Sequence, residues 1–380
     1  MNANYHNPVS ITFGAGALSA LPGVVAGRKA VVVTFPEAEA LGLANRLKLL
    51  LGDSLLGIEA GTVPNPDIAN LTALYEHFWK HYAKAELVIG VGGGSALDTA
   101  KALIVGTANG KFAELVELLA AGKPFKPARV KPLIAIPTTA GTGSEVTPWA
   151  TVWDRTPGAQ KKYSLHLPET WPEAAVVDPE LAVSLPAEPT LAAGLDALSH
   201  SLEAIWNVNC NPISDTFAIS AAREVLSALP HLMQNLGNLA LRRRMALAAL
   251  KAGLAFSNTK TALAHSISYD MTLNHGLPHG IACSFTLPMV LRRALGADPI
   301  RDAVLAQVFD GPLRDAPVQL DRFLEKLGVS TDFTAYGVAQ DESERMIAAA
   351  LDGVRGKNFI ARVPASAPPP AAAQEAKEAS

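Results

Sequence analysis

A short apolar run leads directly into three consecutive glycines and then into a helix-like stretch. Residues 86–91 have the composition of a buried strand, and Gly92-Gly93-Gly94-Ser95 follows at once. Residues 96–103 then carry apolar side chains at helical spacing. A strand that turns this tightly into a helix restricts the fold more than any other feature of the chain, since it indicates an α/β unit.

Similar apolar runs occur on both sides of this segment. Residues 29–34, 55–60 and 132–137 read as further strands, and helical spacing occurs at residues 37–51 and around Tyr75. Alternation of strand and helix predicts a mostly parallel sheet that is covered by helices on both faces.

The composition changes after about residue 180. Residues 189–291 are dominated by Ala and Leu at helical spacing, and residues 298–362 continue as helices broken by Gly and Pro. We therefore predict an α/β dinucleotide-binding domain over residues 1–182 and an all-α domain over residues 183–363. Residues 364–380 are rich in Pro, Ala and Glu, and we expect this tail to be disordered.

Composition narrows the classes of function. Hydrophobic residues make up 49% of the chain and the formal net charge is −3, which fits a folded enzyme and gives no basic face for nucleic acid. The run Arg242-Arg243-Arg244 reads as a solvated helix face. Cys210 and Cys283 lack CxxC spacing, so we expect no disulfide and a reducing compartment. With no signal-like start and no membrane-length apolar run, we expect a cytoplasmic protein without nucleic-acid or membrane partners.

The glycine loop suits a phosphate ligand. Gly92, Gly93 and Gly94 let the backbone approach a pyrophosphate closely, and the N–H groups of the following helix supply donors and a favourable dipole. The hydroxyl of Ser95 adds one more donor. A tight turn without any ligand explains the same residues, and the spacing is not the GxGxxG of the usual Rossmann fingerprint.

A second loop, residues 137–147, also follows a predicted strand. Its hydroxyl groups, on Thr138, Thr139 and Thr142, suit contacts to ribose, phosphate and nicotinamide. A loop that binds no ligand accounts for these hydroxyl groups nearly as well. Two such loops reinforce each other, because ligands of open parallel sheets bind at the carboxyl ends of the strands.

Four residues in the helical half suggest a metal site. Asp196 and His200 are four residues apart on a predicted helix, so both side chains lie on one face. His265 and His279 follow farther along the chain. Three imidazoles and one carboxylate suit Fe²⁺ or Zn²⁺. A single Asp–His helix pair is more often a surface hydrogen bond, and the interpretation depends on the four residues converging.

Together these motifs resemble the iron-containing (group III) alcohol dehydrogenases, in order from about residue 13 to residue 291. The resemblance is carried by the glycine loop with Asp98 and Lys101, the threonine loop, Asp196 with His200, and His265 with Pro278-His279-Gly280. It implies a cleft between a dinucleotide-binding domain and a helical domain, and a homodimer. The residues implied as metal ligands are Asp196, His200, His265 and His279. Those implied as cofactor contacts are Gly92, Gly93, Gly94, Ser95, Asp98, Thr138, Thr139 and Thr142.

The sequence departs from the family pattern at the expected proton relay and at the cofactor ribose. Many members carry a second His four residues after the third ligand, where this chain has Tyr269, so Tyr269 and His275 become the catalytic candidates. Many also carry an acidic residue after the first strand. Here the sequence is Thr34-Phe35-Pro36, which is compatible with NADPH as well as NADH.

Lys260 suggests a class of substrate. Where relatives have small residues ahead of the third ligand, this chain has Asn258-Thr259-Lys260-Thr261, which resembles the phosphonoacetaldehyde reductase branch of the family. A cation near the metal suits an anionic substrate, and we expect Lys260 and Ser144 to bind it. A solvent-facing lysine, or one that contacts a cofactor phosphate, is the alternative. Lys162 is common in the family and receives no substrate role.

The sequence thus predicts a metal-dependent, NAD(P)-linked oxidoreductase that interconverts a small aldehyde and a primary alcohol. Phosphonoacetaldehyde and 2-hydroxyethylphosphonate are the expected pair. The alternatives are a general short-chain alcohol or lactaldehyde dehydrogenase, a dehydroquinate synthase-like lyase that returns the hydride within one turnover, and a non-catalytic nucleotide-binding protein.

Overall fold

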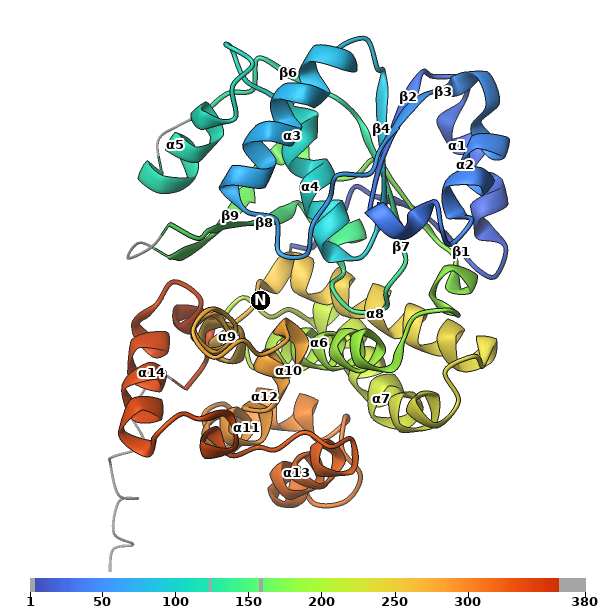
Figure 1. Cartoon of the computed structure of the whole chain (residues 1–380). Helices are drawn as coiled ribbons and strands as arrows, with labels where there is room; N and C mark the ends of the chain where they lie inside the picture. Colours follow the sequence, from blue (N-terminus) through green and yellow to red (C-terminus); the bar gives the residue numbers. More distant parts are fainter. Residues whose placement is uncertain (1–3, 123–124, 157–159, 362–380) are drawn as a thin grey trace, which may run out of the picture.

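The computed structural model describes residues 4–122, 125–156 and 160–361 and shows a sheet domain stacked on a helical domain (Figure 1). The sheet and its helices come from the first part of the chain, up to β10, and the helices from α6 onward form the other domain. The tail predicted over residues 364–380 lies outside the described residues.

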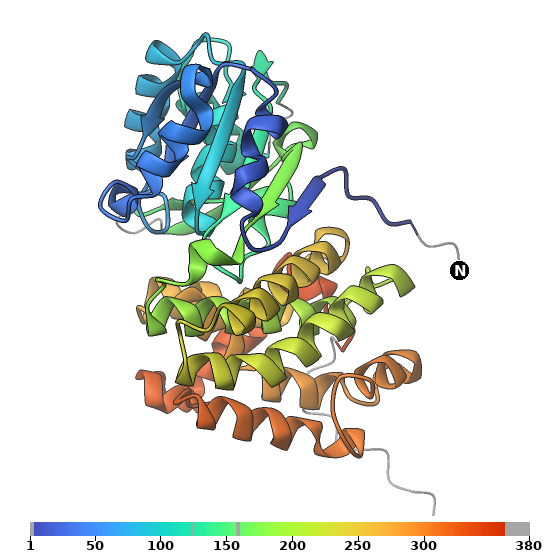
Figure 2. The same cartoon turned by 90° about the vertical axis from the view of Figure 1, so that its right-hand side faces the viewer.

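The sheet has six strands, all parallel, as the alternating pattern predicts. In spatial order they are β1 (Ser10–Phe13), β10 (Ala174–Val177), β7 (Leu133–Pro137), β4 (Leu87–Gly92), β2 (Ala30–Thr34) and β3 (Leu55–Glu59). Figure 2 shows β1 at one edge of the sheet. The glycine loop therefore leaves a central strand, β4, whose neighbour β7 leads into the threonine loop.

Helices cover both faces of this sheet, since successive side chains of each buried strand point to opposite faces. Val31 and Val33 pack in the cluster that includes α3 and α4, whereas Ala30 and Val32 pack in the cluster that includes α1 and α2 (Figure 1). The helices of this domain are α1 (Leu21–Val25), α2 (Leu43–Leu51), α3 (Ile68–His81), α4 (Gly94–Ile104) and α5 (Ala113–Ala121).

The helix expected over residues 37–51 begins later than predicted. Only a short 3-10 turn forms at Pro36–Ala38, and α2 starts at Leu43. Gly42 precedes it with φ of 72°, a left-handed conformation that a continuous right-handed helix does not contain.

Two small antiparallel pairs complete the sheet domain. The pair of β5 (Val105–Gly106) and β6 (Arg129–Val130) lies at its outer end. The hairpin of β8 (Trp149–Asp154) and β9 (Lys161–His166) lies on the side that faces α9 (Figure 1). This hairpin was not predicted from the sequence, and it supplies one wall of the candidate active site.

The second domain consists of helices, as predicted. Its helices are α6 (Ala187–Ile205), α7 (Pro212–Gln234), α8 (Leu239–Thr259), α9 (Leu263–Leu273), α10 (His279–Ser284), α11 (Leu287–Ala294), α12 (Pro299–Leu305), α13 (Ala316–Lys326) and α14 (Gln340–Asp352). Helix α6 packs against α7, α8 and α10, and most of its residues from Gly194 to Ile205 are buried. No helix in the described part of the chain combines the length and the hydrophobicity that a membrane crossing needs.

The expectation of a solvated face at Arg242-Arg243-Arg244 is wrong for its first member. Arg242 is only 3% exposed. Its guanidinium donates to Thr190 Oγ1 and to the carbonyl of Leu185, each at 2.8 Å. It thereby ties the start of α8 to the start of α6, because a buried guanidinium is stable only when its donors are satisfied.

Candidate active site

Four side chains that the sequence predicts as metal ligands lie together at the top of the helical domain. Asp196 Oδ1 is 3.7 Å from His200 Nε2, one turn along α6, and 3.4 Å from His265 Nε2 on α9. His279, at the start of α10, belongs to the same cluster: Asp196, His265, His279 and Cys283 each offer a ligand atom, all within 4.8 Å of one another. Residues from three helices therefore converge on one point.

This cluster fits a divalent cation. Asp196 Oδ1 and His265 Nε2 are buried and have no hydrogen-bond partner among the described residues. Buried polar atoms in a folded protein are normally satisfied, so two such atoms that face each other indicate a missing ligand. The donor set of imidazole nitrogen and carboxylate oxygen suits Fe²⁺ and Zn²⁺.

The electrostatics of the cluster also favour a cation. Burial lowers the pKa of His200 to about 4 and lowers that of His279 well below its ordinary value, so both imidazoles are neutral at pH 7 and have a free lone pair. Burial acts on Asp196 in the opposite direction, but the imidazoles of His200 and His265 outweigh it and hold the pKa of this carboxyl far below its ordinary value.

Glu203 is a supporting residue that the sequence analysis missed. It is completely buried, and its carboxylate accepts a hydrogen bond from His265 Nδ1 at 2.7 Å. It also accepts from the backbone N–H groups of Ala262, Ala264 and His265. This contact directs His265 Nε2 toward Asp196. Glu203 lies three residues after His200, so the helix face that carries Asp196 and His200 contains a signal for it.

Cys283 is a second residue of the cluster that was not predicted from the sequence, where it was considered only as a disulfide partner. It lies four residues after His279 on α10, and its Sγ is 3.6 Å from His279 Nε2. Because the thiol is buried and directed at the cluster, it adds a soft donor to the nitrogen and oxygen donors.

The glycine loop presents an uncapped helix start. Gly93 is the N-cap of α4 and makes no side-chain cap hydrogen bond, so the first N–H groups of α4 are open to a ligand. Gly94 and Ser95 line the cavity described below. Ser95 Oγ accepts from the N–H of Asn65 at 3.0 Å, which leaves its own proton for donation.

The threonine loop closes against the glycine loop and against the helical domain. A Cβ on Gly94 would lie 2.7 Å from the Thr142 methyl group, and one on Gly143 would lie 2.6 Å from the Cα of Gly253 on α8. Glycine at both positions therefore allows the close approach. Thr142 lines the cavity, whereas Gly92, Gly93, Thr138 and Thr139 do not; these four residues contact one another where the two loops leave their strands.

Asp98 and Ser144 were predicted to contact ligands. Both line the cavity, and in the structure their side chains are hydrogen-bonded to each other. Ser144 Oγ donates to Asp98 Oδ1 at 2.8 Å, and Thr151 N–H donates to Asp98 Oδ2 at 2.8 Å. Lys101 is fully buried and donates to Ser144 and to the carbonyl of Trp149. This network joins α4, the threonine loop and the β8–β9 hairpin into one support.

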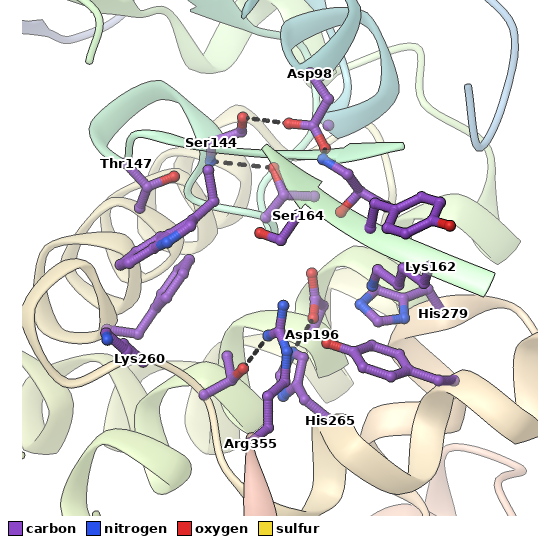
Figure 3. Close-up of a pocket in the computed structure, with 18 of the residues that line it drawn as sticks. Asp98, Ser144, Thr147, Lys162, Ser164, Asp196, Lys260, His265, His279 and Arg355 are labelled. Atoms are coloured by element: carbon purple, nitrogen blue, oxygen red, sulfur yellow. Dashed lines mark hydrogen bonds and ion pairs between the residues drawn. The ribbon is translucent and has the colours of Figure 1, made fainter. Parts of the chain in front are cut away.

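These parts surround a cavity of about 700 Å³. The start of α4 and the threonine loop, which follow β4 and β7, form its upper side, the hairpin forms one wall, and α6, α8, α9 and α10 form its floor. Figure 3 shows Asp98 and Ser144 above, and Asp196, His265 and His279 below. The nucleotide-type loops and the metal-type cluster therefore face each other across one space.

The two predicted catalytic residues differ in position. Tyr269, one turn after His265, lines the cavity, and its hydroxyl is buried without a hydrogen-bond partner among the described residues. His275 does not line the cavity. It follows the end of α9, and its Nε2 lies 3.5 Å from Glu342 on α14. The expectation of a relay through His275 is therefore not supported, since the chain turns away after Leu273.

Three cationic side chains line the same cavity. Lys260, predicted from the sequence, is exposed and follows α8 with φ of 67°. Lys162 on β9 and Arg355 after α14 also line it, although the sequence analysis gave neither a role. Figure 3 shows Lys260 at one end, with Lys162 and His279 at the other.

This arrangement, a dinucleotide-type sheet domain facing a helical domain that carries the metal-type cluster, is the one expected of a metal-dependent dehydrogenase. Residues 8–179 match the family model for iron-containing alcohol dehydrogenase, and residues 190–363 match the model for the C-terminal part of the Fe-containing alcohol dehydrogenase family. The chain belongs to the iron-containing alcohol dehydrogenase family. It is accordingly an NAD-dependent alcohol dehydrogenase or aldehyde reductase, which confirms the resemblance, the fold class and the enzyme class predicted from the sequence.

Individual relatives act on different substrates. The chain is 31% identical over 366 residues to the NAD-dependent methanol dehydrogenase of Bacillus methanolicus, covering 92% of this chain and 94% of the relative. It is 34% identical over 265 residues to the phosphonoacetaldehyde reductase of Streptomyces viridochromogenes, covering 65% and 66%. The structure of sulfoacetaldehyde reductase from Bifidobacterium kashiwanohense in complex with NAD⁺ is similar, with a TM-score of 0.86, 29% identity and 94% of each chain covered.

Proposed function

We propose that this enzyme interconverts a short anionic aldehyde and its primary alcohol, with phosphonoacetaldehyde and 2-hydroxyethylphosphonate as the pair. One observation carries the proposal: a cation-binding cluster and three cationic side chains, Lys162, Lys260 and Arg355, line one cavity beside the glycine loop. Similarity to relatives named as phosphonoacetaldehyde and sulfoacetaldehyde reductases supports an anionic substrate.

Asp196, His200, His265 and His279 would hold the metal ion, Fe²⁺ or Zn²⁺, with Cys283 beside them. A cation bound there supplies Lewis-acid polarisation of the carbonyl oxygen of the substrate. Glu203 fixes the orientation of His265 through its Nδ1–H. Burial keeps His200 and His279 neutral, so both are ready to bind without losing a proton.

The sheet domain would hold the nicotinamide cofactor. The open N–H groups at the start of α4 suit its pyrophosphate, and Ser95 adds a hydroxyl donor. The network of Asp98, Ser144 and Lys101 holds the surrounding loops in place, which is a positioning role. Residues Thr34-Phe35-Pro36 include no acidic side chain, so we propose that NADPH as well as NADH is accepted.

A panel of substrates tests this function. The metal-loaded protein, prepared with Fe²⁺ and separately with Zn²⁺, is assayed for oxidation of NADH and NADPH with phosphonoacetaldehyde, lactaldehyde and propanal. We expect the highest kcat/KM for phosphonoacetaldehyde. Equal or higher values for the neutral aldehydes would instead favour a general alcohol dehydrogenase, the second candidate, which the similarity to methanol dehydrogenase supports.

The same assay separates a lyase from a dehydrogenase. A dehydroquinate synthase-like enzyme returns the hydride within one turnover and would show no net oxidation of added cofactor.

A homodimer and a cytoplasmic location stay predictions from the sequence.

A further inference from the structure

Tyr269 lies between two cationic groups in the cavity. Lys162 Nζ is 4.4 Å from the centre of its ring, and Arg355 Cζ is 5.1 Å from the same point. Lys162 belongs to β9 of the sheet domain, Tyr269 to α9, and Arg355 to the segment that follows α14. Three separate stretches of chain therefore bring hydrogen-bond donors together around Tyr269.

No carboxylate forms an ion pair with these donors in the described part of the chain, although Asp196 and Asp98 lie near enough to Lys162 to affect its pKa. Within residues 4–122, 125–156 and 160–361, neither Lys162 nor Arg355 forms an ion pair with a carboxylate. Arg355 donates to Thr261 Oγ1, which leaves most of its five N–H groups for another acceptor. The buried hydroxyl of Tyr269 also has no partner there. A buried donor between two unpaired cations indicates an acceptor with negative charge.

The electrostatics agree with this interpretation. Burial and the facing charge of Arg355 lower the pKa of Lys162 to about 8, so an anion between the two would relieve their repulsion. Burial raises the pKa of Tyr269, which keeps its hydroxyl protonated as a donor.

The spacing suits a two-carbon substrate. Tyr269 lies one helical turn after His265, and Cβ atoms at that spacing are about 5–6 Å apart. An aldehyde oxygen at the metal cluster would thus place a phosphonate or sulfonate, two carbons away, near Tyr269. Lys260 lies at the other end of the cavity from Lys162 and His279 (Figure 3).

We propose that Arg355, Lys162 and the Tyr269 hydroxyl form the subsite that binds the anionic group of the substrate, a tetrahedral oxyanion with three free oxygens. The inference rests on the proposed function, whose sequence-based form assigned this role to Lys260. Because Lys162 belongs to one domain and the other two residues to the other, the bound anion contacts both sides of the cleft.

Direct binding tests the subsite without relying on turnover. Methylphosphonate and methanesulfonate are titrated by calorimetry into the metal-loaded, NADH-bound protein and into Arg355→Met, Lys162→Met and Tyr269→Phe. The loss of charged hydrogen bonds predicts that Kd rises about 10- to 100-fold in the first two variants. The Tyr269→Phe variant loses one neutral donor and should show a rise of about 3- to 10-fold.

Matched variants exclude a general loss of charge or of folding. Lys161→Met removes the exposed neighbour of Lys162 on the same strand and should leave Kd unchanged. Arg355→Lys keeps the charge but loses the planar guanidinium group and its several N–H donors, so its Kd should lie between those of wild type and Arg355→Met. The tighter of the two anions identifies whether the substrate carries a phosphonate or a sulfonate.

Two results are decisive and separable. Unchanged Kd in both Arg355→Met and Lys162→Met, or a loss of binding in Lys260→Met instead, would overturn the subsite even if phosphonoacetaldehyde proves to be the substrate. Binding of methylphosphonate that depends on Arg355 would support the subsite even if phosphonoacetaldehyde is not reduced, in which case the proposed function alone fails.

Discussion

Glu203→Gln is the substitution that most directly examines how the protein prepares its metal cluster. Each carboxylate oxygen of Glu203 accepts two hydrogen bonds: Oε1 from the N–H groups of Ala264 and His265, and Oε2 from Ala262 N–H and His265 Nδ1. Although burial raises the pKa of Glu203, His265 and these N–H groups outweigh it and lower the pKa, so the side chain is ionised. It can therefore only accept, and His265 Nδ1 must carry the proton.

Glutamine has one acceptor oxygen and one donor NH₂ group. Whichever way the amide is turned, its NH₂ faces two former donors. Leaving two buried donors unsatisfied, or one where the imidazole of His265 changes tautomer, should lower the free energy of unfolding by about 1–6 kcal/mol. If the NH₂ faces His265 Nδ1, the imidazole proton moves to Nε2, which is the nitrogen that faces Asp196. Loss of such a supporting contact typically weakens metal binding by about 10- to 100-fold, or roughly 1.4–2.7 kcal/mol.

The assay is competition for Zn²⁺ between the protein and a chelator of known affinity, together with thermal unfolding of the metal-free protein. Glu145→Gln is the matched control. Glu145 is another buried carboxyl, in the sheet domain, and burial raises its pKa to about 7, so an amide there removes less negative charge at pH 7 than it does at the ionised Glu203. A metal Kd in Glu203→Gln within twofold of wild type would refute the reasoning, since His265 would then be oriented without Glu203.

Two further outcomes follow from the geometry. The depressed pKa of Lys162 predicts that kcat/KM for sulfoacetaldehyde relative to propanal is constant below pH 8 and falls as the pH rises through about 8. The sulfonate keeps one charge across this range. The groups that face the ammonium group of Lys162 are Arg355, Asp196, Asp98 and Cys283. If the ratio of the two kcat/KM values stayed constant up to pH 9.5, roughly 1.5 units above that pKa, the role assigned to Lys162 would be wrong. Gly280→Ala would place a Cβ 1.8 Å from the carbonyl oxygen of Ala192, forcing α10 away from α6. We expect a loss of about 1–3 kcal/mol in stability and weaker metal binding by displaced His279, and metal titration that matches wild type would argue against it.

The sheet and the metal ligands could be predicted because their signals are local. Buried parallel strands read as continuous apolar runs, so β2, β4 and β7 were visible in the sequence. Asp196 and His200 share a helix face by their spacing, which periodicity shows directly. The convergence of His265 and His279 on them came from the resemblance to a family, since no local pattern places α9 and α10 beside α6.

The elements that the sequence analysis missed or misplaced depend on contacts between distant segments. The β8–β9 hairpin has mixed exposed and buried residues and lacks an apolar run, so it gave no clear signal. Arg242 looked solvated because its acceptors, Thr190 and Leu185, come from another helix and its preceding loop. Gly42 delays the start of the helix expected over residues 37–51, through a backbone conformation that composition alone does not reveal.

The unsatisfied groups of this protein give a common physical account of the site. Asp196 Oδ1, His265 Nε2 and the Tyr269 hydroxyl are buried polar atoms without partners in the described residues, and all three residues line one cavity. Folded proteins tolerate such departures mainly where a ligand completes them. The first two atoms suit a cation, and the third, with Arg355 and Lys162 beside it, suits an anion. In the proposed function, a short aldehyde that carries an oxyanion would satisfy both, because its carbonyl oxygen would reach the cation site while its charged end would bind the donors around Tyr269.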